Sequence, residues 1–123
     1  MVQMLMAEPT DNPNPDLLPH LLVIGCGDLG GAVAAHFATQ GWRVTGVRRH
    51  ISAIAGVDMI TADVTDPATL APLRALVPEF VLIVLTPGGF NDARYRAVYV
   101  DGLAHVLAHL DCSRLRRVFW VSS

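Results

Sequence analysis

A cluster of glycines follows the first aliphatic run of the chain, in the segment VIGCGDLGG that begins at Val23. Gly25, Gly27 and Gly30 form the pattern G-x-G-x-x-G, which is typical of a turn that binds the diphosphate of a dinucleotide. The first glycine permits a tight turn, the second lets the backbone approach a phosphate, and the third lets the next helix pack close to the strand. The amides at the start of that helix can then donate to the phosphates.

The residues between these glycines, Cys26, Asp28 and Leu29, belong to the same candidate phosphate-binding turn. Asp28 stands where the helix would begin, which favours a role as helix cap over a contact with the ligand. Leu29, Val33 and Phe37 would share the core-facing side of that helix. A glycine turn can also merely connect a strand to a helix, but here the strand before it and the amphipathic helix after it favour binding.

Two arginines, Arg48 and Arg49, follow the second aliphatic run, where an acidic residue would bind the ribose hydroxyls of NAD. Guanidinium groups suit the 2′-phosphate of NADP, because they donate charge-assisted and often bidentate hydrogen bonds. We therefore expect NADP(H) as the preferred cofactor and NAD(H) as the alternative. A solvated basic pair on a surface loop is the competing interpretation of the same residues.

The segment ADVTD places Asp63 and Val64 directly after the third aliphatic run. Ligands of parallel sheets collect at the carboxyl ends of the strands, so these two residues are candidates for a contact with adenine. The alternative is that Asp63 and Asp66 cap the next turn, a role that we expect for Asp66 in any case.

The segment LTPGG, residues 85–89, follows the fourth aliphatic run and begins with Leu85, Thr86 and Pro87. Its glycines indicate a flexible loop at the same edge of the sheet. We expect this loop to lie near the nicotinamide half of the cofactor.

Strand-like aliphatic runs alternate with helical patterns from residue 20 onward. The expected strands are 21–24, 43–47, 57–62, 80–85 and 117–121, and the expected helices are 29–40, 50–55, 67–77 and 92–110. The strands are continuous apolar runs, which indicates a parallel sheet covered by helices on both faces. We predict an α/β protein with a Rossmann-like doubly wound parallel sheet of five strands in the order 3-2-1-4-5.

The helix expected at 92–110 has an apolar stripe at three- and four-residue steps, which would lie on the sheet. The stripe consists of Tyr95, Val98, Tyr99, Gly102, Leu103, Val106, Leu107 and Leu110. The opposite face carries Arg94, Asp101, His105 and His109. The two histidines lie one turn apart without a visible third ligand, so we expect a solvated face and no metal site. Pro72 lies inside the helix expected at 67–77, where we expect a kink or a late start.

Composition and charge restrict the class of protein. The chain has 123 residues, of which 52% are hydrophobic and 16% charged, with a mean hydropathy of +0.42, so one globular domain is expected. A net charge of −2 offers no general attraction to nucleic acid. Neither a membrane helix of about 18 apolar residues nor a secretory signal is visible. We expect a cytoplasmic protein with Cys26 and Cys112 as reduced thiols.

The N-terminal segment, residues 1–19, is rich in proline and polar residues and is expected to be a disordered tail. The domain would then occupy residues 20–123. All 9 basic residues are arginine, so no Tyr-x-x-x-Lys pair exists within this sequence.

With these residues in place, the chain resembles the short-chain dehydrogenase/reductase superfamily, in its extended or atypical branch of NAD(P)-dependent epimerase/dehydratase proteins. The resemblance spans residues 20–123. Its motifs are VIGCGDLG, GWRVTGVRR, ADVTD, VLIVLTP, YRAVYVDGLAHVLAHL and RRVFWVSS. The contacts that it implies are Gly25, Gly27 and Gly30 for the diphosphate, Arg48 for the 2′-phosphate, Asp63 and Val64 for adenine, and Thr86 and Pro87 for the ribose and nicotinamide.

The chain departs from the pattern of this family in two places that point to the atypical branch. Tyr99 stands where the family often has asparagine, and the glycine spacing is G-x-G-x-x-G instead of G-x-x-G-x-x-G. The family's catalytic serine or threonine lies at or beyond residue 123, and its Tyr-x-x-x-Lys lies further on. We therefore expect an incomplete Rossmann domain, truncated after the fifth strand, that binds a cofactor but is inactive alone.

The resemblance implies an epimerase, dehydratase or reductase that acts on a nucleotide-sugar or another small carbonyl or hydroxyl substrate, with a homodimer as one option. Two other classes of protein share parts of the pattern. A ligand-sensing Rossmann module of the potassium-transport regulatory type would bind NAD(H) or an adenine nucleotide without catalysis. A β-hydroxyacid or prephenate-type dehydrogenase shares the glycine turn, but ADVTD argues against it.

Overall fold

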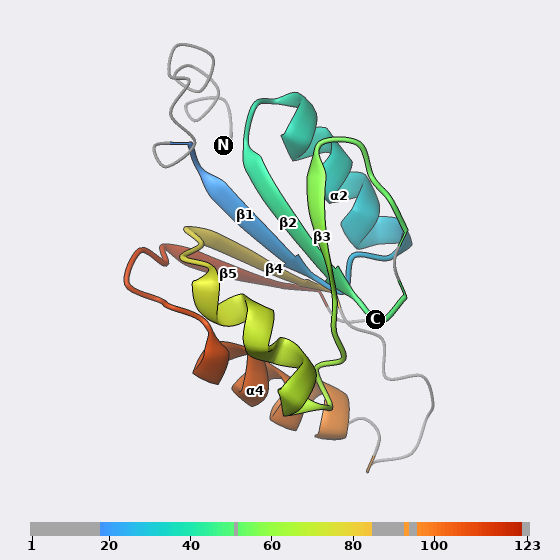
Figure 1. Ribbon diagram of the computed structural model, residues 1–123, viewed down its shortest axis with the longest axis vertical. Helices are drawn as coiled ribbons and strands as arrows, with labels where there is room; N and C mark the ends of the chain where they lie inside the picture. The colour runs from blue at the N-terminus through green and yellow to red at the C-terminus, as the bar shows by residue number, and fades with distance from the viewer. Residues whose placement is uncertain (1–17, 51, 85–92, 94–95, 122–123) are drawn as a thin grey trace.

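The computed structural model describes residues 18–50, 52–84, 93 and 96–121. These residues form a parallel five-stranded sheet in the order β3-β2-β1-β4-β5 (Figure 1). The strands are β1 (His20–Ile24), β2 (Arg43–Arg48), β3 (Val57–Thr61), β4 (Phe80–Val84) and β5 (Arg117–Val121). The predicted Rossmann-like fold and its strand order are confirmed.

Helices cover both faces of this sheet (Figure 1). The helix α2 (Asp28–Thr39) lies on one face and contacts β1, β2, β3 and β4. The other face carries the 3₁₀ helix η3 (Pro67–Ala75), the π-helix η4 (Ala97–Asp101) and the helix α4 (Gly102–His109). The strands β1, β2 and β4 place side chains in a core on each face of the sheet, as a doubly wound arrangement requires. The expected burial on both faces does not hold for β5, whose five residues are exposed.

The central strand β1 contributes to two separate cores. Leu22 and Ile24 pack with the aliphatic residues of η3 and α4, whereas Leu21 and Val23 pack with Ala34 of α2. Successive residues of a strand point to opposite faces, so every residue of β1 is buried although its side chains alternate. The glycine turn follows Ile24 directly and therefore lies at the edge of the sheet where β1 ends.

Two of the expected helices differ from the structure. Residues 52–56 contain no helix; a turn at Ala55 and Gly56, where Gly56 has a φ of +78°, leads directly into β3. So short a segment has too few internal hydrogen bonds to offset the cost of helix nucleation.

The segment expected to kink at Pro72 is instead a 3₁₀ helix along its whole length. Pro72 has no N–H and would interrupt an α-helical ladder. The 3₁₀ helix, which is wound more tightly than an α-helix, extends over Pro67–Ala75 in place of a single kink. The Oδ1 atom of Asp66 accepts a hydrogen bond from the Ala68 amide at 3.2 Å, which confirms Asp66 as the cap.

The apolar stripe that the sequence predicts for the last helix is only partly confirmed. Val98, Tyr99, Gly102 and Val106 are buried, but Leu107 is 39% exposed, and His105 is half-buried instead of solvated. Part of this helix consists of the π-turns of η4, which contain more residues per turn than an α-helix. The face that meets the sheet therefore rotates relative to the stripe expected for a uniform α-helix. Tyr95 and Arg94 lie outside the described residues.

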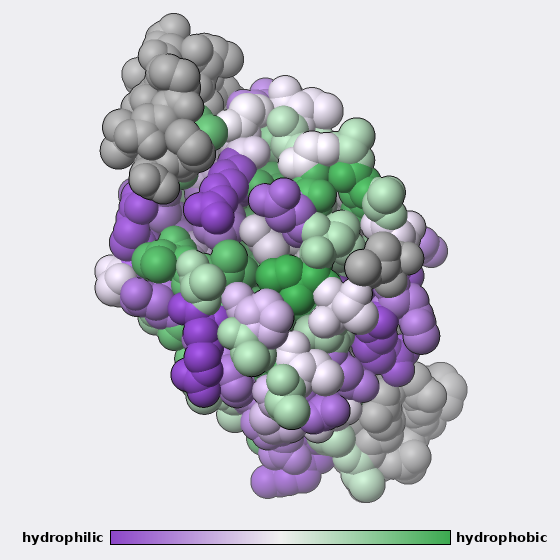
Figure 2. All heavy atoms as spheres, in the orientation of Figure 1, coloured by the Kyte–Doolittle hydropathy of each residue, from purple (hydrophilic) through white to green (hydrophobic). Residues whose placement is uncertain are grey.

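The strand β5 pairs with β4 along one edge, and its five residues are all exposed. Four of them are large and apolar, namely Val118, Phe119, Trp120 and Val121. On the face drawn in Figure 2, apolar patches alternate with hydrophilic side chains. Within the part of the chain that the structure describes, no helix combines the length and apolarity needed to cross a membrane.

A buried histidine makes the stability of this fold depend on pH. His20 is 4% exposed, and its Nε2 atom lies 2.8 Å from the Oγ1 atom of Thr45. Burial, with a smaller contribution from Arg43, lowers the pKa of His20 from 6.5 to about 4. The unfolded chain therefore binds a proton at this residue below pH 6.5, whereas the folded chain does so only below about pH 4.

We expect the free energy of unfolding to fall between pH 6.5 and about pH 4, by up to about 3 kcal/mol from this histidine. Urea denaturation followed by circular dichroism across this range measures the effect. The variant His20→Gln cannot take up the proton and should show a shallower dependence. An equal slope in both proteins would contradict the role of His20.

Candidate functional site

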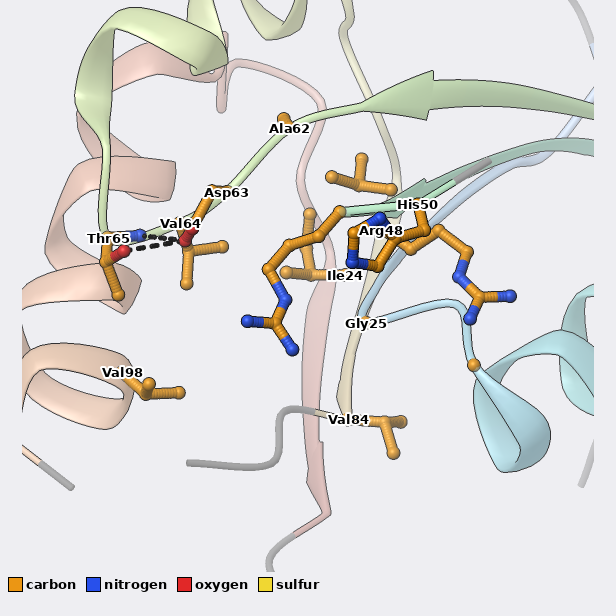
Figure 3. A pocket seen from close by; sticks show the side chains of 13 residues that line it. Ile24, Gly25, Arg48, His50, Ala62, Asp63, Val64, Thr65, Val84 and Val98 are labelled. Carbon is orange, nitrogen blue, oxygen red and sulfur yellow. Dashed lines mark hydrogen bonds between the residues drawn. The ribbon is translucent and has the colours of Figure 1, made fainter. Parts of the chain in front are cut away.

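A cavity of about 260 Å³ lies at the carboxyl edge of the sheet, where β1, β2, β3 and β4 end (Figure 3). Three groups of residues that the sequence singled out line it together: Gly25 and Gly27 from the glycine turn, Arg48 and Arg49 from the end of β2, and Asp63 and Val64 after β3. The topology brings them together because neighbouring parallel strands end at the same edge.

The glycine turn is tied to β2 by its own backbone. Gly25 has a φ of +88°, a left-handed conformation that favours glycine. The amides of Gly25 and Cys26 both donate to the carbonyl oxygen of Val47 at 2.9 Å, and the Gly27 amide donates to the Gly25 carbonyl at 2.8 Å. These three amides hold the shape of the turn, so they are not the donors that a ligand would use.

The donors directed beyond the turn are at the start of α2. The helix begins at Asp28, and the Gly31 amide makes the first helical bond, at 2.6 Å to the Gly27 carbonyl. The amides of Asp28, Leu29 and Gly30 precede that bond, and such amides have no acceptor within their own helix. Together with the positive end of the helix dipole, these amides make the start of α2 a candidate anion site next to the cavity.

The two remaining glycines of the motif have different roles. A Cβ atom on Gly30 would lie 2.5 Å from the Gly25 carbonyl oxygen, so only glycine allows α2 to pack this closely on the turn. A Cβ atom on Gly27 would meet nothing within 4 Å, so the space in front of this backbone is open. The packing role predicted for Gly30 is confirmed, whereas phosphate binding stays a prediction.

Two side chains of the turn differ from their predicted roles. Asp28 is the first helical residue and makes no capping bond, because Gly27 occupies the N-cap position. Leu29 is 54% exposed and does not share the core face with Val33 and Phe37. Leu29 lies one turn before Val33, at the end of α2 next to the glycine turn.

Cys26 belongs to the turn but its side chain points away from the cavity. The side chain is fully buried, and its Sγ atom would be 2.7 Å from a Cβ atom placed on Gly46. Burial raises the pKa of this thiol, although the charge of Arg48 opposes the shift. Any contact of Cys26 with a ligand would therefore involve its backbone.

A third basic residue joins the two arginines. His50 lines the same cavity as Arg48 and Arg49. Three consecutive residues at and after the end of β2 therefore form one side of the cavity. Figure 3 shows Arg48 and His50 next to each other at the end of β2. His50 was not predicted from the sequence, although its place directly after the arginine pair was the available signal.

The turn after β3 is held together by its own side chains. The Thr65 amide and hydroxyl donate to Oδ1 of Asp63 at 2.9 and 2.7 Å (Figure 3). The Asp66 amide donates to the Asp63 carbonyl at 2.9 Å. The alternative role of Asp63 as a capping residue is therefore confirmed. Asp63 also lines the cavity, so a contact with adenine stays a prediction.

Apolar residues that sequence reasoning missed complete the walls of the cavity. They are Ile24, Val47, Ala62, Val84 and Val98. Four of them lie at the ends of strands, and their position could have been inferred from the predicted sheet. Val98 comes from η4, and nothing in the local sequence indicated that it would reach this edge.

Other predicted contacts lie outside the described residues, namely Leu85, Thr86 and Pro87. Val84, the last described residue before them, lines the cavity. In the described ranges, no group of at least three histidine, cysteine, aspartate or glutamate side chains could hold a metal ion.

Comparison with solved structures shows which proteins share this fold. A protein from Methylobacillus flagellatus, described as an NAD-dependent epimerase/dehydratase, is 40% identical, with a TM-score of 0.71 over 86% of this chain. A short-chain dehydrogenase/reductase superfamily protein from Agrobacterium tumefaciens, solved with bound NAD, is 28% identical, with a TM-score of 0.70 over 85% of this chain. The resemblance to the epimerase/dehydratase proteins is thus confirmed.

This chain spans only 37% and 32% of the lengths of these two epimerase/dehydratase and reductase structures. Vestitone reductase from alfalfa, at 18% identity and a TM-score of 0.62, shares the fold alone. No protein-family model matches the sequence, and no curated protein matches it. The similarity therefore concerns the Rossmann part of these proteins.

Proposed function

We propose that this chain is the cofactor-binding domain of an NAD(P)-dependent protein of the epimerase/dehydratase type. The observation that carries the proposal is the start of α2, where the amides of Asp28, Leu29 and Gly30 precede the first helical bond beside an open Gly27. Such a site suits a diphosphate, because its oxygens accept several hydrogen bonds and its charge is stabilised by the helix dipole. The solved relative that contains NAD supports a dinucleotide as the ligand.

The cavity suits the adenosine half of that dinucleotide. Its volume of about 260 Å³ lies just below the range usual for small-molecule sites, so it has room for one nucleoside and not for the whole cofactor. Apolar walls from Ile24, Val64 and Val98 can contact the faces of an adenine ring. The nicotinamide half would extend past Val84 toward Thr86 and Pro87.

The finer part of the proposal is a preference for NADP(H) over NAD(H). Arg48, Arg49 and His50 line the cavity from one side and are the basic residues among its lining. A 2′-phosphate placed there would accept charge-assisted hydrogen bonds that a ribose hydroxyl cannot match in strength. The preference would be a property of this chain, since the relative solved with a cofactor contains NAD.

Calorimetric titration of the purified chain tests the function. We expect NADPH to bind about tenfold more tightly than NADH at low salt, with a ratio that shrinks as salt screens the half-buried Arg48 and the exposed Arg49. Tighter binding of ATP or ADP than of either dinucleotide would instead favour the ligand-sensing module. Binding of none of these ligands would refute the proposed site.

The reaction of the whole protein is proposed at a coarser level. By resemblance it is an epimerisation, dehydration or reduction of a nucleotide-sugar or another small carbonyl or hydroxyl compound. These 123 residues contain no lysine, so the Tyr-x-x-x-Lys pair that transfers the proton is not among them. We expect this chain alone to bind the cofactor without turnover. A homodimer, a cytoplasmic location and a disordered tail at residues 1–19 stay predictions.

A further inference from the structure

We propose that His105 of α4 is a positioning residue for the adenosine part of the site, acting through the turn that contains Val64. The inference rests on the proposed function, because it assigns this turn to the wall of a nucleoside pocket. His105 lies 41 positions away from Val64 in the sequence, yet its Nδ1 atom is 2.8 Å from the Val64 carbonyl oxygen. Since a carbonyl can only accept, Nδ1 is the donor.

Hydrogen bonds among its own residues close this turn, whereas the Val64 carbonyl accepts from His105 of α4. The bonds of Asp63 with Thr65 and Asp66 close the turn, and the Thr69 hydroxyl oxygen accepts from the Asp63 amide at 2.9 Å. All these partners lie within seven residues of one another. They maintain the shape of the turn. The Ala62 amide donates to the Arg48 carbonyl at 3.1 Å and attaches the start of the turn to β2, so its other side depends on a contact from the helix layer.

Helix α4 supplies this contact at two successive positions of one face. A Cβ atom on Gly102 would lie 2.7 Å from Cγ2 of Val64, so the helix backbone and the valine side chain are already in close contact. His105 is one turn further along and bonds to the carbonyl of the same valine. Val64 is thereby held from the helix side at its side chain and at its peptide group.

The opposite side of Val64 faces the cavity. Val64 is 7% exposed and lines the cavity together with Asp63, Thr65 and Val98. Loss of the histidine would free the Val64 peptide to rotate, and the wall of the pocket would then have to be ordered again when a ligand binds. His105 itself does not line the cavity, so it affects binding only through this turn.

The test compares His105→Ala with His105→Asn in the full chain. The side-chain amide of asparagine places a donor near the position of Nδ1, so it can restore the bond, whereas alanine cannot. We expect His105→Ala to bind NADH and AMP about five- to tenfold more weakly, by the same factor for both, and His105→Asn to recover most of the loss. Hydrogen exchange of the Thr65 amide should be faster in His105→Ala even without ligand.

The control is His109→Ala, which removes a half-buried histidine from the same helix. The Nδ1 atom of His109 bonds to the carbonyl of His105 at 2.7 Å, within α4 itself. This variant should bind NADH like the wild type. If His105→Ala is too unstable to measure, Gly102→Ala pushes against Val64 from the same helix face and should also weaken AMP binding.

Two results would overturn the inference. One is a folded His105→Ala protein that binds AMP as tightly as the wild type; the other is a loss of affinity that His105→Asn does not restore. Failure of the wild type to bind any of these nucleotides would refute the proposed function instead. The exchange rate of the Thr65 amide would still report whether His105 holds the turn.

Discussion

Replacing Gly30 with alanine is expected to lower the free energy of unfolding by about 2 kcal/mol and to weaken dinucleotide binding at least tenfold. The added Cβ atom would lie 2.5 Å from the Gly25 carbonyl oxygen, which belongs to backbone and cannot rotate away. Either α2 or the glycine turn must therefore move, and both contribute to the proposed anion site. Urea denaturation and calorimetry with NADPH measure the two effects.

Gly31 provides a matched control for this substitution. A Cβ atom there would lie 3.3 Å from Cδ1 of Ile54, the end of a flexible side chain that can yield. Both glycines lie in the first turn of α2. Substitution by alanine should therefore raise the helix propensity by about 1 kcal/mol at either position. The difference between the two variants therefore reports the clash with Gly25. Equal stabilities would show that the helix is not held against the turn.

Replacing Arg48 and Arg49 together by alanine is expected to weaken NADPH binding by about 30-fold while NADH binding changes by less than about threefold. Both arginines line the cavity at the end of β2, where the 2′-phosphate would lie. NADH has no phosphate at this position and loses only a weak long-range attraction to the two charges. Calorimetry at constant ionic strength with both cofactors gives the two ratios.

Arg43 is the matched control for the arginine pair, because it lies at the opposite end of the same strand. Arg43→Ala removes a positive charge without approaching the cavity and should leave the ratio of the two affinities unchanged. A loss of NADPH and NADH affinity by the same factor in the double variant would mean that the arginines attract any dinucleotide. The proposed preference for NADP(H) would then be wrong.

The fold was predictable because its signals are local. The apolar runs of β1 and β4 and the glycine turn after Ile24 indicate a parallel sheet from the sequence alone. The conformation of Gly25 was predictable for the same reason, since the tight turn itself requires a positive φ. The helix expected at 50–55 was wrong, because a short apolar pattern does not reveal whether it can form enough hydrogen bonds.

The sequence by itself determined the class of fold, the place of the candidate anion site after β1 and the basic character of the segment after β2. Only the tertiary structure decided that Asp28, Leu29 and Gly30 are the available donors, because the Val47 carbonyl occupies the amides of Gly25 and Cys26. It also decided that His105 meets Val64, 41 residues away. Periodicity and glycine placement act over a few neighbouring residues, whereas the partner of a distant carbonyl depends on how whole elements pack.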